Sequence, residues 1–226
     1  MVACVLASGV AVALSACGSA KPVASPPVIV KAKASVTPAA ATPAGFQRVG
    51  GAAQGISFAA PASWVAVDFA QQTLQQAARK LGISGMSQSA IEQDMEALSK
   101  LHAAYAMDTA SMESSPKHFA TNISGYCTSS GITDSGSAAI AYIRASVTSE
   151  LQQFHAHGLG VTDVTVGGVP GVRNLYELGT SLGTVEEGQL DVAPKPDDFC
   201  FITLTAPAGQ FPTSELTTAA STAQFP

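Results

Sequence analysis

Hydrophobic positions after residue 45 recur with two different periods, and the longer period predicts helices. It is clearest over 137–157, where apolar residues recur at steps of three and four: Ile140, Ile143, Val147, Leu151 and Phe154. We expect the glycine that follows, Gly158, to end this helix. The same spacing predicts a helix over 71–81, a second helix that Ser89 caps, and a short last helix from Pro212 to near Phe225.

The shorter period, together with short apolar runs bounded by Gly and Pro, predicts strands. The segments are 46–49, 56–59, 64–67, 103–110, 118–128, 161–166, 172–179, 185–192 and 199–205. Tight turns at Gly167-Gly168 and at 181–183 separate the strands of the second half. Because tight turns join antiparallel strands, we expect an α+β sandwich in which helices cover an antiparallel sheet.

The N-terminal segment differs from this pattern. Val2 to Ala16 is a stretch of 15 apolar or small residues without a charge. A helix that spans a membrane needs about 20 such residues, whereas the hydrophobic region of a secretory signal is shorter. The first positive charge is Lys21, so we expect the true translation start to lie upstream of Met1. The alternative is an uncleaved core helix.

The end of this segment, Leu14-Ser15-Ala16-Cys17, resembles a bacterial lipobox. The resemblance implies cleavage between Ala16 and Cys17 and acylation of the Cys17 sulfur. The acyl chains would anchor the protein to the cell membrane on its extracytoplasmic face.

The residues after Cys17 are rich in Pro, Ala, Ser and Thr up to about Gly45 and have no amphipathic period. Such a composition does not bury enough apolar area to offset the entropy of ordering, so we expect an extended tether. The predicted organisation is a signal peptide over 1–16, a lipid-anchored linker over 17–45 and a globular domain over 46–226.

The chain has four cysteines: Cys4, Cys17, Cys127 and Cys200. Cys4 leaves with the signal and Cys17 takes the lipid. The two that remain lie in a chain bound for an oxidising compartment, so we expect a Cys127–Cys200 disulfide. Two separate buried thiols are the alternative.

Charge excludes one class of partner. The formal net charge is −5, and the 11 Lys and Arg residues are scattered singly. A nucleic-acid binder concentrates positive charge to displace counterions from phosphates, so we expect no nucleic-acid partner. No pattern of metal ligands or cofactor motif is present, and we expect neither a metal nor a cofactor.

One catalytic motif occurs, in the stretch Gly179-Thr180-Ser181-Leu182-Gly183. It matches the G-x-S-x-G nucleophile elbow, which needs a helix directly after the serine and a His later in the chain. All four His precede Ser181, and the residues after it form a poor helix. We therefore interpret the glycines as a hairpin turn, and a serine hydrolase that uses Ser181 is a remote alternative.

Other polar residues have structural interpretations. His155 and His157 fall in the predicted last helical turn, where they cannot share a metal and where a cation favours the helix dipole. The pairs Glu186-Glu187 and Asp197-Asp198 are interpreted as exposed turn acids rather than a calcium site. Trp64 is expected to close the edge of the core, with stacking on a ligand as the alternative.

A family resemblance rests on the order of several segments. GISFAAPASW, HFATNISGYC, a long helix, VTVGGVPGVRNLYEL, GQLDV and FCFITLTAP, followed by an amphipathic helix, resemble the LpqN-type lipoproteins of mycobacteria and related actinobacteria. These belong to the PsbP-like fold superfamily. The resemblance covers about Phe46 to Pro226, and it implies a central antiparallel sheet with helices on both faces, a non-enzymatic role in the cell envelope and no catalytic residues.

Together these observations predict a cell-envelope lipoprotein that acts as a non-enzymatic binding or adaptor module for envelope proteins. Its membrane contact is the N-terminal lipid. The alternative function is an extracytoplasmic carrier or sensor of a lipid or small apolar ligand.

Overall fold

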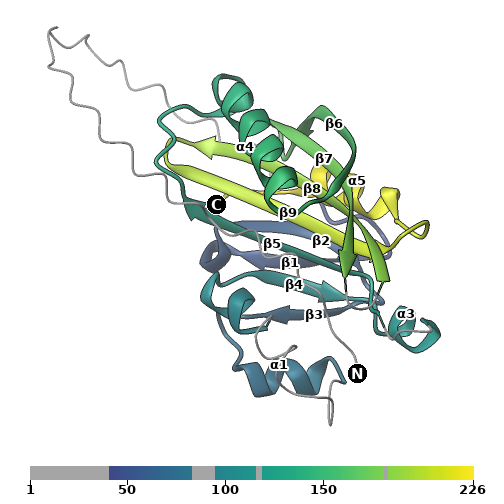
Figure 1. Ribbon diagram of the computed structural model, residues 1–226. Helices are drawn as coiled ribbons and strands as arrows, with labels where there is room; N and C mark the ends of the chain where they lie inside the picture. Colours follow the sequence, from purple (N-terminus) through teal and green to yellow (C-terminus); the bar gives the residue numbers. More distant parts are fainter. Residues whose placement is uncertain (1–40, 83–94, 116–118, 181–182) are drawn as a thin grey trace, which may run out of the picture.

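A computed structural model of the chain describes residues 41–82, 95–115, 119–180 and 183–226. Its main feature is a seven-stranded sheet in which every neighbouring pair is antiparallel (Figure 1). The spatial order is β3 (Val65–Asp68), β4 (Ala104–Met107), β5 (Asn122–Ser129), β9 (Asp198–Pro207), β8 (Gly183–Lys195), β7 (Val169–Thr180) and β6 (His157–Val166). The predicted α+β class with a central antiparallel sheet is confirmed.

One face of this sheet is covered by a β-hairpin and the last helix. The hairpin pairs β1 (Phe46–Gly51) with β2 (Ile56–Pro61), and the single turn η1 (Ala52–Gln54) joins them. Next to β2 lies α5 (Thr213–Thr222). The large side chains of this core layer have almost no exposed surface: Ile56, Phe58, Ile123, Leu190, Ile202, Leu204 and Leu216. Gly188 lets α5 approach β8 closely, because a Cβ there would overlap Phe211 and Leu216.

The opposite face carries the other helices, so helices lie on both faces as the resemblance implied. The short turn η2 (Gly136–Ala139) leads into α4 (Ile140–Gln153), which packs over β7 and β6, whereas α1 (Leu74–Lys80) lies beside β3 (Figure 1). Residues 95–100 are also helical. Two separate apolar clusters result, one under α1 and one under α4.

Local sequence signals explain several element ends. Thr73 and Gln76 form a reciprocal capping box at the start of α1, and Gly82 adopts the left-handed conformation just beyond its end. Gly167 and Gly168 both have positive φ, which suits the two-residue turn between β6 and β7.

Several predicted boundaries were wrong. The strand expected over 118–128 begins at Asn122, and the strand expected over 161–166 begins at His157. The strand expected over 103–110 ends at Met107, because the Asp108 carboxylate accepts hydrogen bonds from the backbone N–H groups of Ala110 and Ser111 and so caps α3 (Thr109–Ser114).

The helix expected over 137–157 ends at Gln153. His155 takes the left-handed position after the helix, and the N–H of Ala156 binds the Leu151 carbonyl, as in a Schellman motif. Gly158 therefore does not end the helix.

Several predicted features lie outside the described residues. These are the signal segment with Cys4, Ala16 and Cys17, the linker as far as residue 40, Ser89, His118 and Ser181. Among the helices of the described ranges, none combines the length and apolarity needed to cross a membrane.

Candidate functional site

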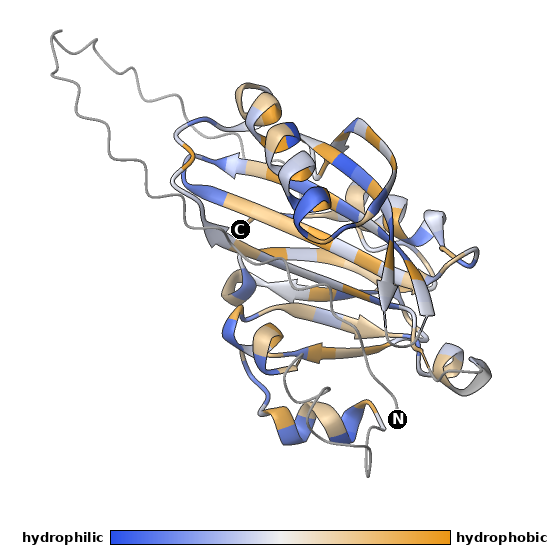
Figure 2. Ribbon diagram, in the orientation of Figure 1, coloured by the Kyte–Doolittle hydropathy of each residue, from blue (hydrophilic) through white to orange (hydrophobic). Residues whose placement is uncertain are grey.

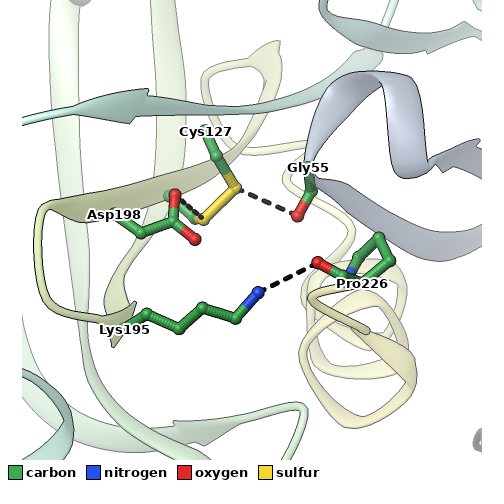
Figure 3. The surroundings of a disulfide bond; sticks show 6 residues. Gly55, Cys127, Lys195, Asp198 and Pro226 are labelled. Atoms are coloured by element: carbon green, nitrogen blue, oxygen red, sulfur yellow. Dashed lines mark hydrogen bonds between the residues drawn. A yellow bond between two sulfur atoms is a disulfide. The ribbon is translucent and has the colours of Figure 1, made fainter.

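The predicted disulfide joins Cys127 on β5 to Cys200 on β9. The two cysteines are direct partners in the register of these central strands, which places their side chains on the same face. The Cys127 sulfur lies 3.3 Å from the carbonyl oxygen of Gly55, between β1 and β2 (Figure 3). A Cβ at Gly55 would meet the Cys127 side chain at 3.0 Å, so the glycine lets the hairpin rest against the disulfide.

The disulfide also determines how a neighbouring ligand set is interpreted. In the described ranges, Cys127, Asp198 and Cys200 are the one group of three Cys, His, Asp or Glu residues whose ligand atoms lie together. Because both sulfurs are bonded to each other, this group offers only the Asp198 carboxylate to a cation.

Four acidic residues were predicted to be exposed turn acids, and the structure places them in different environments. Asp197 is exposed in the β8–β9 turn, where the hydroxyl of Ser129 donates a 2.8 Å hydrogen bond that holds the pKa of this carboxyl below its ordinary value. Asp198 begins β9. Glu186 and Glu187 instead lie within β8, and Glu187 is fully buried. The prediction was wrong for both: Glu186 is half-buried in a strand rather than exposed in a turn, and the side chain of Glu187 points to the face that α4 covers.

Glu187 belongs to a buried polar cluster, which we call the α4 cluster. The hydroxyl of Tyr176 on β7 donates a 2.6 Å hydrogen bond to Glu187 Oε2. Two residues farther along β8, Gln189 Nε2 donates to Asp191 Oδ1 at 2.8 Å and to Glu150 Oε2 on α4 at 3.2 Å. The cluster therefore links α4 to the middle of the sheet. Figure 2 shows hydrophilic residues alternating with apolar ones along these strands.

The carboxyl groups of the α4 cluster favour the protonated form. Burial raises the pKa of Glu187 to about 7, and the hydrogen bond from Tyr176 opposes this only in part. Burial also raises the pKa of Asp191 well above its ordinary value and raises that of Glu150. Within the described ranges, no Lys, Arg or His forms an ion pair with these three carboxyls. Glu187, with a pKa of about 7, is thus partly protonated at neutral pH.

The β6 edge, defined as the outer side of His157–Val166, is the most accessible part of the sheet. β6 pairs with β7, and no strand of the described ranges pairs with its other side. Most of its ten residues are exposed, and Leu159 is 46% exposed. Arg144 on α4 donates to Asp163 at 2.7 Å and ties the strand to the helix. An unpaired strand edge offers backbone N–H and C=O groups to an added strand.

The two histidines near this edge do not lie where the sequence placed them. His155 follows α4 with a φ of 53°, and His157 opens β6. His157 faces Glu177 on β7, with Nδ1 3.8 Å from Oε2. The prediction that both lie in the last helical turn was wrong, because the helix ends before them.

Trp64 is 8% exposed and belongs to the core layer between the sheet and the β1–β2 hairpin. Its carbonyl accepts a 2.6 Å hydrogen bond from the side chain of Gln47 on β1. Ser181 lies outside the described residues, but β8 begins at Gly183. A strand thus stands where a nucleophile elbow needs a helix.

No protein-family model and no curated protein matches this chain. Solved structures with a similar fold include PsbP (CyanoP) of Synechocystis, with 12% identity, a TM-score of 0.46, and coverage of 87% of this chain and 99% of that protein. The Ran-binding protein Mog1p of Saccharomyces cerevisiae is 11% identical, with a TM-score of 0.44 over 80% of this chain and 95% of Mog1p.

A protein of Bacteroides thetaiotaomicron is 11% identical, with a TM-score of 0.42 over 76% of this chain. This chain spans 45% of that protein's length. A PsbP protein is thus among the structural neighbours, whereas the LpqN-type relationship and the actinobacterial origin stay expectations from the sequence.

Proposed function

We propose that this chain is a non-enzymatic binding module of the bacterial cell envelope, similar to the LpqN-type lipoproteins, that docks onto an envelope protein at the β6 edge. Acylated Cys17 holds it on the extracytoplasmic face of the cell membrane. The observation that carries the proposal is the long, exposed and unpaired β6 edge.

The location is supported by two independent features. The lipobox-like Leu14–Cys17 predicts the anchor, and the Cys127–Cys200 disulfide favours an oxidising compartment. Residues 18–45 have the composition of a mobile spacer, which would let the folded domain reach a partner at some distance from the bilayer.

The mode of docking follows from the chemistry of the edge. An extended peptide segment that adds to an edge strand makes backbone hydrogen bonds, and side chains on alternate positions give specificity. At the β6 edge, Leu159 supplies an exposed apolar contact next to Gly158 and Gly160, where the pairing with β7 is irregular. The partner we expect is therefore an envelope protein with an extended, partly apolar segment.

The Cys17→Ala variant is expected to leave the membrane. Without the thiol no acyl chain is attached, so the protein should move from the membrane fraction to the soluble fraction when cells are fractionated and blotted. Cys4→Ala is the matched control and should stay in the membrane fraction. Retention of Cys17→Ala in the membrane would contradict lipid anchoring.

A photocrosslinking residue at position 159 is expected to capture one specific envelope protein in intact cells, identified by mass spectrometry. The same residue at position 142 is the matched control, because Tyr142 is also 46% exposed but lies on α4 rather than on the strand. We expect a clearly higher yield at position 159, because a contact inside an interface is captured more often than one outside it. Equal capture at both positions, or none at 159, would refute docking at the β6 edge.

The alternative function, a carrier or sensor of a lipid or small apolar ligand, is favoured by a different observation: a pocket beside α5. Trp64 does not line that pocket.

A further inference from the structure

A pocket of about 250 Å³ lies between α5 and the strands β6, β7 and β8. We call it the α5 pocket. Its apolar wall includes Leu190 on β8 and Leu216 and Ala220 on α5. Its polar lining includes Arg173 on β7 and the hydroxyl residues Thr217 and Ser221. It lies on the sheet face opposite the α4 cluster.

Arg173 lines the pocket with a charged side chain that has no ion-pair partner in the described ranges. Its Nε atom is buried and has no hydrogen-bond partner. No carboxylate of the described ranges forms an ion pair with it. Its direct partners in the sheet are Thr162 on β6 and Leu190 on β8, which are both uncharged. Arg173 therefore brings a guanidinium without a carboxylate partner to the pocket wall, and an anion that reaches this group would be bound favourably.

The hydroxyl groups on α5 do not replace this donor. Thr217 Oγ1 donates to the Thr213 carbonyl at 2.8 Å, and Ser221 Oγ donates to the Thr218 carbonyl at 3.0 Å. Both protons are thus used within the helix. The charged donor that a ligand meets in the α5 pocket is Arg173.

The size of the pocket limits the ligand. At about 30 Å³ for each water-sized group, the volume holds about eight such groups. Pockets for drug-sized molecules are usually larger, at about 300 to 1,000 Å³. The occupant is therefore small.

We propose that the α5 pocket binds a small monoanionic amphiphile, a carboxylate with a short aliphatic chain. The carboxylate accepts hydrogen bonds from the planar guanidinium of Arg173, a geometry that suits a two-oxygen acid group. The chain lies against Leu190, Leu216 and Ala220. This inference rests on the lining of the pocket and not on docking at the β6 edge, although Val164 and Thr165 of β6 belong to that lining.

Calorimetric titration of the full-length chain with octanoate at pH 7.5 tests the proposal. We expect saturable binding of one octanoate, and we expect octanol and octylamine to bind at least about tenfold more weakly, because neither supplies an anionic acceptor. Octyl phosphate serves as a further arm that distinguishes a carboxylate from a phosphate site. Octanol binding as tightly as octanoate, tighter binding of octyl phosphate, or no octanoate binding would overturn the proposal.

Two variants test whether octanoate binds in the α5 pocket. Arg173→Met keeps an unbranched side chain but removes the guanidinium and its charge, and it should weaken octanoate binding by at least about tenfold. Arg79→Met, at an exposed position on α1, is the matched control and should bind as the natural chain does. An unchanged affinity for Arg173→Met would overturn the assignment.

A second variant keeps the test valid if Arg173→Met does not fold. Ala220→Leu leaves the charge in place and fills the apolar part of the pocket. It should reduce octanoate affinity while circular dichroism and the cooperative unfolding transition remain native. Full affinity in a folded Ala220→Leu protein would show that the ligand lies elsewhere and would also overturn the proposal.

Discussion

Replacing both Cys127 and Cys200 by Ala is expected to lower the free energy of unfolding by about 4 kcal/mol in the chain-entropy account of disulfides. The bond closes a loop between residues 73 positions apart, and such a long loop strongly restricts the unfolded chain. For a domain of this size, the melting temperature should fall by about 10 °C.

Thermal and urea unfolding, followed by circular dichroism, measure this loss. Cys17→Ala is the matched control, since it removes a cysteine outside the pair and should leave the melting temperature unchanged. Reducing the natural protein should reproduce the result of the double replacement. A double variant as stable as the natural protein would show that the sheet and its two layers hold β5 against β9 without the bond.

The Glu187→Gln variant is expected to be more stable than the natural protein at pH 8, by up to about 3 kcal/mol, and nearly equal to it at pH 4.5. Burial raises the pKa of Glu187 to about 7 in the folded protein, whereas an unfolded glutamic acid has an ordinary value near 4.5. Gln is neutral at every pH, and its side-chain oxygen still accepts the hydrogen bond from Tyr176.

The direction of the pH effect follows from proton binding. Between pH 4.5 and about 7, the folded protein holds a proton on Glu187 that the unfolded chain has lost, so stability falls as the pH rises. Above about pH 7, Glu187 is ionised in both the folded and the unfolded state. The stability that its protonation contributed is then fully lost. Asp191 and Glu150 have raised pKa values and act in the same direction.

Urea unfolding at several pH values from 4.5 to 8 measures this dependence. The natural protein should lose stability as the pH rises, and Glu187→Gln should flatten the curve without abolishing it. Glu186→Gln is the matched control, because its side chain points to the other face of β8, and it should keep the natural slope. A stability that increases from pH 5 to 8 in the natural protein would contradict the buried, protonated state of Glu187.

The α+β fold could be predicted because alternation along each strand and helical spacing along 140–153 reflect which side chains face the core. The hairpin between β6 and β7 was equally predictable, since two glycines with positive φ leave few alternatives. The sequence did not reveal that β1 and β2 form a separate hairpin over the sheet, because whether a hairpin joins the main sheet or packs on its face depends on tertiary packing rather than on local pattern.

The α4 cluster was missed for a related reason. Glu187, Gln189 and Asp191 alternate with apolar residues along β8, and such alternation is typical of a strand with one face in water. Here α4 covers that polar face. The strand was therefore predictable, whereas the burial of its acids depended on the position of a helix about forty residues earlier in the chain.

The last residues of the chain belong to the same layer as the β1–β2 hairpin and form hydrogen bonds with it. The backbone of Ser57 on β2 bridges Gln224, and the carbonyl of Thr222 accepts a 2.6 Å hydrogen bond from Arg48 on β1. These contacts join residues more than 160 positions apart. Loop closure over such distances makes folding slow, and the layer cannot form until the C-terminal segment has been synthesised. A chain that acquires its final structure this late is exposed to proteases and to aggregation until its last residues have been synthesised.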